Sequence, residues 1–291
     1  MIDGLYTLAE ILAPAEAQGF AVGAFTVWNA ESVDAVLAAA QAESAPVILM
    51  VGPMELPLLG AENYARLVRL FVANYDLPVC LHLDHGVQIE MAREALAAGF
   101  SSVMLDYSDY LLEENIAATR EVVEAARRTG ASVEAEIGHV GMADGFSSEV
   151  ITAESTLTDP AEAVQFAAAT EVDALAVSVG TAHGLAPGLP VLDFARLAEI
   201  HRRAPAPLVL HGGTGRGADQ LREAIGLGVR KVNIANDLNR VFVRTVAEAL
   251  EAGEGYFWHS AALAEMKRGL EPVVRGHLQT LGAAGKAEGY R

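Results

Sequence analysis

The side chains best suited to chemistry are concentrated at residues 82–86, where the sequence reads HLDHG. The residues before them alternate in the way that is typical of a buried strand, and a glycine ends the run. The three ionisable groups of His82, Asp84 and His85 would be costly to bury without compensation, so a metal ion or a bound ligand is one explanation. The alternative is one exposed histidine beside two hydrogen-bonded side chains.

Further polar side chains follow other apolar runs in the same manner. The positions at the carboxyl ends of predicted strands, or just beyond them, are Asp106, Glu136, His183, His211 and Asn233. Side chains without a common role would be scattered along the strands instead. If the strand ends converge, His85, His183 and His211 meet, which suits a catalytic zinc with three histidine ligands and an open fourth position.

A glycine-rich segment, HGGTG, spans residues 211–215 and begins at one of these positions, His211. It connects a predicted strand to a predicted helix, and its glycines would let backbone N–H groups approach a phosphate at the helix N-terminus. Many such turns only reverse the chain. The polar segment 233–236, at the end of the following strand, favours the phosphate interpretation.

Apolar runs of strand length alternate with segments of helical periodicity through most of the chain. The predicted strands are residues 21–27, 46–51, 79–85, 102–106, 132–137, 174–178, 207–211 and 231–234. The predicted helices are residues 7–19, 30–43, 61–74, 89–98, 113–128, 160–170, 193–203, 217–227 and 237–252. Eight strand–helix units of similar length indicate an α/β fold in which a parallel (β/α)8 TIM barrel closes on itself.

One barrel domain accounts for residues 1–291, because such barrels commonly run to about 250 residues and no low-complexity linker interrupts this chain. A hydrophobic fraction of 52% is enough for a large core. Residues 253–291 exceed what the barrel requires. We expect them to form a C-terminal helical extension that caps the barrel or contacts another subunit.

The composition narrows the classes of function. A formal net charge of -18 disfavours a nucleic-acid-binding surface, so an anionic substrate would have to be held by local donors. The single cysteine, Cys80, cannot form an internal disulfide, and its place in an apolar run indicates core packing. With no basic, apolar leader and no run near the roughly 18 apolar residues of a membrane span, we expect a cytoplasmic protein.

Six motifs spread over nearly the whole chain resemble those of the class II, zinc-dependent ketose-bisphosphate aldolases, the fructose- and tagatose-bisphosphate group. They are HLDHG at 82–86, MLD at 104–106, SVEAEIG at 132–138, GTAHG at 180–184, LHGGTG at 210–215 and KVN at 231–233. The resemblance implies a metal-dependent carbon–carbon lyase that acts on a small phosphorylated sugar.

By that resemblance His85, His183 and His211 would bind Zn2+, and Asp84 would exchange the proton at the aldehyde-derived oxygen. This agrees with elementary chemistry, because zinc polarises a ketone and stabilises the enediolate that forms beside it. A carboxylate would then handle each proton.

Asp106 and Glu136 resemble the secondary acidic positions of the group. There they either accommodate a second cation or an alternative zinc geometry, or they orient the histidines. The resemblance also implies which residues hold the phosphate of the ketose. These are Gly184, Gly212, Gly213, Thr214, Asn233, Ile234, Ala235 and Asn236.

The departures from the family pattern surround the substrate. Where the group carries a mobile-loop Glu that removes a proton from the ketose phosphate, this chain reads GMADG at 141–145, and Asp144 is the nearest substitute. Thr26 stands where the group has Asn, and Asp109 where it has His. These changes leave room for an aldehyde other than a standard sugar phosphate.

We therefore expect reversible cleavage of a ketose (bis)phosphate to dihydroxyacetone phosphate, or a close analogue, and an aldehyde. The second hypothesis is a non-catalytic barrel that keeps the metal and phosphate pocket as a sensor, suggested by the altered loop at 141–145. A zinc hydrolase on the same barrel is a third hypothesis, but the sequence lacks an evident metal-bridging lysine and such an enzyme gains nothing from the phosphate turn. The expected assembly is a homodimer or a homotetramer.

Overall fold

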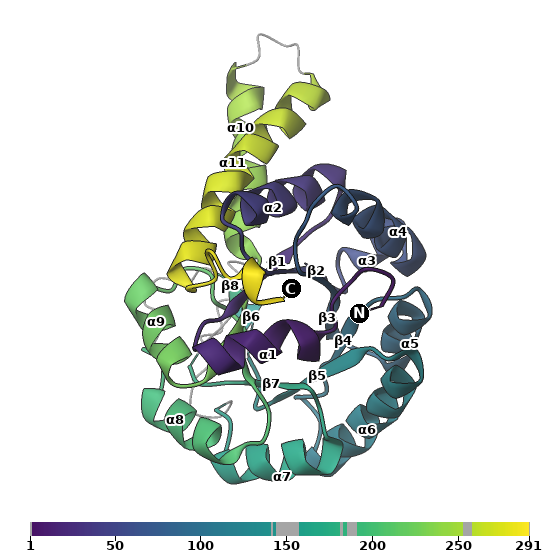
Figure 1. Ribbon diagram of the computed structural model, residues 1–291, viewed down its shortest axis with the longest axis vertical. Coiled ribbons are helices and arrows are strands. Elements are labelled where there is room, and N and C mark those ends of the chain that lie inside the picture. Colours follow the sequence, from purple (N-terminus) through teal and green to yellow (C-terminus); the bar gives the residue numbers. More distant parts are fainter. Residues whose placement is uncertain are drawn as a thin grey trace.

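The computed structural model describes residues 2–140, 142–143, 157–180, 183–184, 191–252 and 258–290, with only the backbone at 142–143, 183–184 and 252. Within these ranges, eight parallel strands form a closed barrel in the order β1-β10-β9-β7-β5-β4-β3-β2 (Figure 1). The barrel strands are β1 (Val22–Thr26), β2 (Val47–Val51), β3 (Val79–Gly86), β4 (Ser102–Leu105), β5 (Ser132–Ile137), β7 (Ala174–Val177), β9 (Leu208–Leu210) and β10 (Val229–Ile234). The predicted TIM barrel is confirmed.

Helices surround this barrel and connect its strands (Figure 1). They are α1 (Leu8–Gln18), α2 (Ala30–Ala42), α3 (Leu56–Leu59), α4 (Ala61–Val72), α5 (Ile89–Ala97), α6 (Leu112–Thr129), α7 (Pro160–Thr170), α8 (Phe194–Arg203), α9 (Ala218–Gly226), α10 (Asn236–Ala252) and α11 (His259–Thr280). A 3-10 turn follows at Ala287–Tyr290. The sequence pattern missed α3 because four residues show no helical period.

Local sequence signals explain where several helices begin and end. Thr7 and Glu10 form a reciprocal capping box at the start of α1, and Gly19 ends that helix in the left-handed conformation. Asp159 caps α7 and is followed by Pro160, whose fixed φ suits the first helical position. These signals set the helix boundaries within a residue or two of the predicted ones.

Helix α1 covers the amino-terminal end of the barrel, so the opposite end remains for chemistry. It packs against β1, β3, β5 and β10 and lies across the barrel in Figure 1. Tyr6 N donates to Val79 O at 2.8 Å, and Ala9 N donates to Ser132 Oγ at 3.0 Å, both at strand starts. The carboxyl ends of the strands therefore face away from this cover.

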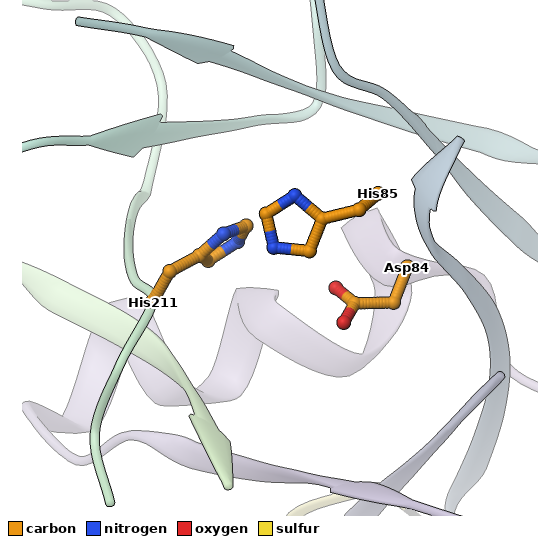
Figure 2. Close-up of side chains that lie close together, drawn as sticks. All are labelled: Asp84, His85 and His211. Atoms are coloured by element: carbon orange, nitrogen blue, oxygen red, sulfur yellow. The ribbon is translucent and has the colours of Figure 1, made fainter. Parts of the chain in front are cut away.

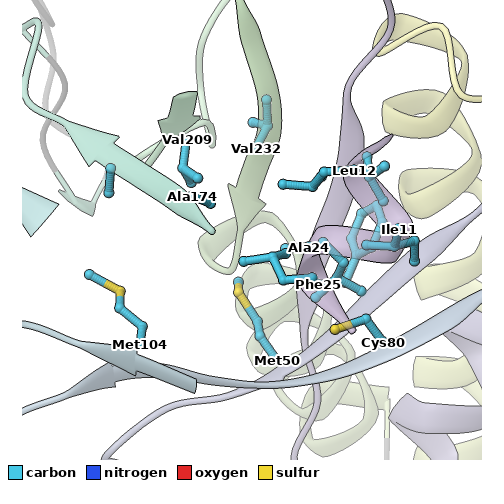
Figure 3. Close-up of a cluster of buried hydrophobic side chains, with 14 of the residues drawn as sticks. Ile11, Leu12, Ala24, Phe25, Met50, Cys80, Met104, Ala174, Val209 and Val232 are labelled. Atoms are coloured by element: carbon cyan, nitrogen blue, oxygen red, sulfur yellow. The ribbon is translucent and has the colours of Figure 1, made fainter. Parts of the chain in front are cut away.

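Apolar side chains from α1 and from strands around the barrel form one buried cluster (Figure 3). Cys80 is a wholly buried member of it, and burial raises the pKa of its thiol to about 12. A neutral thiol among aliphatic side chains acts as a small apolar residue. Core packing is thus confirmed as the role of Cys80.

The C-terminal helices depart from the ring around the barrel. Helices α10 and α11 run side by side away from it, and α11 also packs along α2 (Figure 1). Two ion pairs connect α11 with α2 and the residue that caps its C-terminus. They join Lys267 to Asp34, and Arg275 Nε to Glu43 Oε1 at 2.7 Å. The division into a barrel and a 253–291 extension stays a prediction. None of the described helices has the length and apolar character needed to cross a membrane.

Candidate active site

Six of the side chains predicted to do chemistry lie at the carboxyl end of the barrel, on five strands or directly after them. They are Asp84 and His85 on β3, Asp106 after β4, Glu136 on β5, His211 after β9 and Asn233 on β10. Figure 2 shows Asp84, His85 and His211 directed at one common space. The structure thus brings together residues that are up to 149 positions apart in the chain.

A local irregularity lets two consecutive residues of β3 reach the site. The register between β3 and β4 shifts between Leu83 and Gly86, and His85 has a φ of 44°, which is rare for a residue other than glycine. In a regular strand Asp84 and His85 would point to opposite faces. The bulge re-aims one of them, and such strained positions are often found at functional sites.

His85 is held by a hydrogen-bonded chain that reaches into the loop after β4. Its Nδ1 lies 2.7 Å from Asp106 Oδ2, and Ser108 Oγ donates to Asp106 Oδ1 at 2.7 Å. Burial alone would raise the pKa of Asp106, but the hydrogen bonds from His85 and Ser108 hold it well below its usual range. Burial disfavours the charged form of His85 and would lower its pKa, but the negative charges of Asp84 and Asp106 raise it.

His211 lies between two carboxylates of β5. Its Nε2 is 2.9 Å from Glu134 Oε1, and its Nδ1 is 3.1 Å from Glu136 Oε2. Although burial opposes a charged imidazole, the two carboxylates outweigh it and raise the pKa of His211 to about 10. Glu136 is positioned in turn by Val140 N, which donates to its Oε1 at 2.9 Å. This end of the barrel therefore favours a positive charge at His211.

Glu134 is neutralised by a wholly buried lysine. Lys231 Nζ on β10 lies 2.8 Å from Glu134 Oε2 and 3.1 Å from its Oε1. Burial alone would raise the pKa of Glu134, but Lys231 and His211 keep it well below its usual range. Since Glu134 is thereby an ionised acceptor, it accepts the hydrogen bond of His211 Nε2, so Nδ1 is the nitrogen that would become a metal ligand once it loses its proton.

His82 lies next to Glu134 in the barrel interior and stays neutral. Its Nδ1 is 2.8 Å from Ser102 Oγ, and its Nε2 is 3.7 Å from Glu134 Oε2. Burial, together with the nearby charge of Lys231, lowers the pKa of His82 to about 3. Of the three ionisable groups in the segment 82–86, His82 is therefore a hydrogen-bonded core residue.

The donor atoms around the two histidines suit a divalent cation. Ligand atoms of Asp84, His85 and His211 lie within 4.8 Å of one another, as do those of His85, Asp106 and Glu136. His85 Nδ1 lies against Asp106 and His211 Nε2 against Glu134, and metal-bound histidines usually have such an outer carboxylate partner. The residues present thus fit the predicted metal.

Asp84 is oriented by Asn233 across the barrel mouth. Asn233 Nδ2 donates to Asp84 Oδ1 at 2.8 Å. Burial alone would raise the pKa of Asp84, but the neighbouring imidazoles and Lys231 lower it. An ionised, hydrogen-bonded carboxylate therefore faces the space next to His85.

The glycine-rich turn after β9 lies against β10. Gly212 has a φ of 64°, and Gly213 N donates to Asn233 O at 3.2 Å. A Cβ on Gly213 would lie 2.4 Å from Val232 Cγ1 and 3.0 Å from Asn233 O, so only glycine fits there. The remaining predicted phosphate ligands are near in sequence: Thr214 on this turn, and Ile234, Ala235 and Asn236 at the junction of β10 and α10.

Gly213→Ala is expected to lower the free energy of unfolding by about 1–3 kcal/mol, because the new methyl group overpacks the turn against β10. Gly226→Ala is the matched control, since a Cβ there meets nothing within 4 Å and the position is helical. That control should be neutral or stabilising by up to about 1 kcal/mol. Equal denaturant midpoints for the two variants would contradict the close-approach argument.

The structure describes no side chain for three of the predicted site positions. Asp144 and the side chain of His183 lie outside the described residues, and Gly184 is described only as backbone. The backbone of His183 and Gly184 forms the short strand β8 (His183–Gly184), which pairs in parallel with β6 (Met142–Ala143). Their predicted roles in catalysis, metal binding and phosphate binding stay predictions.

The sequence pattern assigned no role to Glu134 and Lys231, which lie directly behind His211. A signal was present in each strand, because Glu134 and Glu136 are two residues apart on β5, and Lys231 and Asn233 are two apart on β10. Residues at that spacing share a face of a strand. A search for two polar residues at this spacing on one predicted strand would have identified both Glu134 and Lys231.

Residues 6–286 match the family described as Fructose-bisphosphate aldolase class-II. The chain belongs to this family. A fructose-bisphosphate aldolase of Staphylococcus aureus (strain Mu50 / ATCC 700699) is 35% identical over 287 residues, covering 98% of this chain and 99% of the relative. One from Geobacillus stearothermophilus is 36% identical over 286 residues, covering 97% and 99%.

Solved structures agree with this assignment to the class II aldolases. The YdjI aldolase from Escherichia coli K12 has a TM-score of 0.84 and 29% identity, covering 97% of this chain and 99% of that one. A putative fructose-1,6-biphosphate aldolase from Coccidioides immitis has a TM-score of 0.86 and 28% identity, covering 97% and 98%. The protein is thus a class II aldolase, a carbon–carbon lyase, as the sequence motifs predicted.

Class II aldolases are generally metal-dependent, and this aldolase contains groups that could hold a metal. The enzyme hypothesis is thereby favoured over the non-catalytic sensor. The finer assignments, namely the metal, the substrate and the role of each residue, are proposals.

Proposed function

We propose that this aldolase uses Zn2+ to cleave a ketose (bis)phosphate reversibly into dihydroxyacetone phosphate, or a close analogue, and an aldehyde. The observation that carries the proposal is the convergence of Asp84, His85 and His211, whose ligand atoms lie within 4.8 Å of one another at the barrel mouth. Imidazole nitrogens in an open site suit catalytic zinc. Relatives named fructose-bisphosphate aldolase support a phosphorylated sugar as the substrate.

In the proposed site, His85, His211 and His183 would hold the zinc, the last supplied by the chain after β7. Bound zinc supplies Lewis-acid polarisation of a ketone oxygen. Asp106 and Glu136 orient His85 and His211, or hold a second cation, as their 2.7 Å and 3.1 Å contacts with the two rings allow.

The proton chemistry falls to the carboxylates. Asp84 is ionised and fixed by Asn233, so it can accept the proton of the hydroxyl group that becomes the aldehyde and return it in the condensation direction. In the condensation direction, Asp144 is proposed as the base that removes a proton from dihydroxyacetone phosphate. The turn at Gly212, Gly213 and Thr214, with Gly184 and residues 233–236, would bind the phosphate through backbone N–H groups.

A direct test is to incubate the zinc-loaded protein with dihydroxyacetone phosphate and a panel of aldehydes. Formation of a ketose phosphate with at least one aldehyde, dependent on added metal, is the expected result. Solvent-hydrogen exchange into dihydroxyacetone phosphate reports the first half-reaction without any aldehyde. A zinc-loaded protein that catalyses neither reaction would refute the proposed substrate.

His211→Ala is expected to lower zinc occupancy at micromolar chelator, because it removes one of the proposed imidazole ligands. His259→Ala is the matched control, since His259 is exposed at the start of α11. Metal content after dialysis against chelator gives the result. Full occupancy in His211→Ala would remove His211 from the ligand set, and the same measurement on His183→Ala tests the third ligand.

Asp144→Ala is expected to slow solvent-hydrogen exchange into dihydroxyacetone phosphate by about two orders of magnitude or more, the effect of losing a positioned general base. Zinc content should stay at the wild-type level, because Asp144 is not among the proposed ligands. If exchange proceeds at the wild-type rate in this variant, another residue is the base.

Assembly and location complete the proposal. We expect a homodimer or a homotetramer in the cytoplasm. The α10–α11 pair is the proposed contact, because it extends away from the barrel and exposes Val243, Leu250 and Trp258 (Figure 1). Residues 1–291 would then form a single domain, with 253–291 as its extension.

A further inference from the structure

One carboxyl group at the barrel mouth has no part in the mechanism above. Glu55 lies between β2 and α3, at the carboxyl end of β2, and is half-buried. The β2–β3 register ends with Val51 opposite Leu83, so Gly52 and Asp84 directly follow the last pair of the two strands. Glu55 folds back onto Gly52 and thereby places a second carboxyl group on the Asp84 side of the mouth.

The backbone of this loop is shaped to hold that carboxyl group. Gly52 N donates to Glu55 Oε2 at 3.2 Å. A Cβ on Gly52 would lie 2.9 Å from the same oxygen, so the glycine leaves the room that the carboxyl group occupies. The position of the Glu55 side chain is therefore built into the local sequence.

A buried tyrosine fixes this loop relative to the neighbouring strand. The phenol of Tyr64 on α4 lies 3.1 Å from Glu55 O and 3.2 Å from Trp28 O, the latter at the exit of β1. Tyr64 is wholly buried, and burial, with the charge of Glu55, raises its pKa to about 12. It stays a neutral donor that ties the exits of β1 and β2 together.

The two sides of the mouth differ in charge. Burial and the negative charge of Asp84 raise the pKa of Glu55, so the two carboxyl groups lie close enough to repel each other. Among the described residues, no cationic side chain forms an ion pair with Glu55. On the other side, Arg216 follows the glycine turn, and its Nη2 donates to Gly180 O at 2.8 Å. The guanidinium of Arg216 thus lies on the proposed phosphate side, and two carboxyl groups, those of Asp84 and Glu55, lie on the other.

We propose that Glu55 is a specificity-determining residue that selects an uncharged polyhydroxy aldehyde over a phosphorylated one. This rests on the proposed function, in which the aldehyde fragment lies at Asp84. A second phosphate there would bring a charge of about −1.5 to −2 close to two carboxylates, which disfavours binding. Hydroxyl groups of a neutral aldehyde instead donate to Glu55 in charge-assisted hydrogen bonds.

The test compares glyceraldehyde with glyceraldehyde 3-phosphate of the same configuration, each condensed with dihydroxyacetone phosphate by the zinc-loaded full-length protein. The wild type should show a higher kcat/KM for glyceraldehyde. Glu55→Gln keeps an oxygen for Gly52 N but removes the charge, so kcat/KM for the phosphorylated aldehyde should rise about tenfold or more, mainly through KM. For glyceraldehyde kcat/KM should fall by about three- to tenfold, because hydroxyl groups donate less strongly to the neutral amide than to the carboxylate.

Glu62→Gln is the matched control, because Glu62 lies on the exposed face of α4 and pairs only with Arg66 among the described residues. It should leave the preference between the two aldehydes unchanged. Solvent exchange into dihydroxyacetone phosphate, which needs no aldehyde, should match the wild type in both variants.

Two results would overturn the assignment of Glu55 while leaving the proposed function intact. They are a wild-type preference for the phosphorylated aldehyde, and a preference that Glu55→Gln does not alter, each with exchange still present. Absence of exchange in the wild type would instead refute the proposed function, and this inference with it.

Discussion

Asp84→Asn is expected to slow carbon–carbon bond cleavage by about 10²–10⁴-fold while the protein keeps its fold and its metal. The amide is nearly the same size as the carboxylate, and its oxygen can still accept the hydrogen bond that Asn233 Nδ2 now donates to Asp84 Oδ1 at 2.8 Å. It cannot accept a proton at the operating pH. The loss should therefore appear in kcat, with little change in KM.

Metal content separates this role from an alternative one. The ligand atoms of Asp84 lie within 4.8 Å of those of His85 and His211, so a direct bond from Asp84 to the cation is the competing explanation. Loss of zinc in Asp84→Asn would make Asp84 a ligand, and retained turnover would remove it from the proton chemistry. Asp219→Asn, at a fully exposed side chain on α9, is the control for a lost surface carboxylate.

Lys231→Met is expected to lower the free energy of unfolding by about 3–5 kcal/mol, because it removes the ammonium partner of the wholly buried Glu134 carboxylate and leaves that carboxylate with His211 alone. The volumes of the two side chains are similar, so packing changes little. Chemical denaturation of the metal-free protein gives the measurement without a contribution from bound metal. Lys286→Met, which loses a surface contact with Gln18, should stay within about 1 kcal/mol of the wild type.

The double variant Lys231→Met/Glu134→Gln distinguishes a buried charge from a packing defect. Neutralising Glu134 removes the uncompensated charge and still leaves an oxygen for His211 Nε2, so most of the lost stability should return. A double variant no more stable than Lys231→Met would contradict the ion-pair explanation.

The pH dependence of stability provides an independent check on the same pair. The folded-state pKa of Glu134 is lowered, so its ion pair stabilises the fold fully above the ordinary pKa of about 4.3 and loses that effect as the pH falls through the folded-state value. In Lys231→Met the carboxyl group is buried without its cation and becomes protonated more readily. The difference in stability between wild type and variant should therefore narrow on acidification below about pH 4.

Much of the architecture of this aldolase follows from local sequence signals. Alternation of buried apolar runs with amphipathic segments predicts a parallel barrel, because parallel strands are covered on both sides while helices are covered on one. Helix boundaries follow from residues such as Thr7, Gly19 and Asp159, whose effects extend over a single turn. The mouth residues Asp84 and His211 were identifiable because chemistry in such barrels gathers at the carboxyl ends of strands.

Other features of the site were decided only by the tertiary structure. Lys231 and Glu134 are 97 residues apart, so their pairing depends on which strands share the interior of the closed barrel. The positive φ of His85 depends on a register shift against β4 that no strand specifies alone. In the sequence, Glu55 has no feature that separates it from other loop residues. Its place at the mouth follows from the β2–β3 register, which ends with Val51 opposite Leu83, directly before Gly52 and Asp84. The sequence thus determined which residue types reach the mouth, because strand periodicity is local, whereas their partners and charges depend on contacts between distant segments.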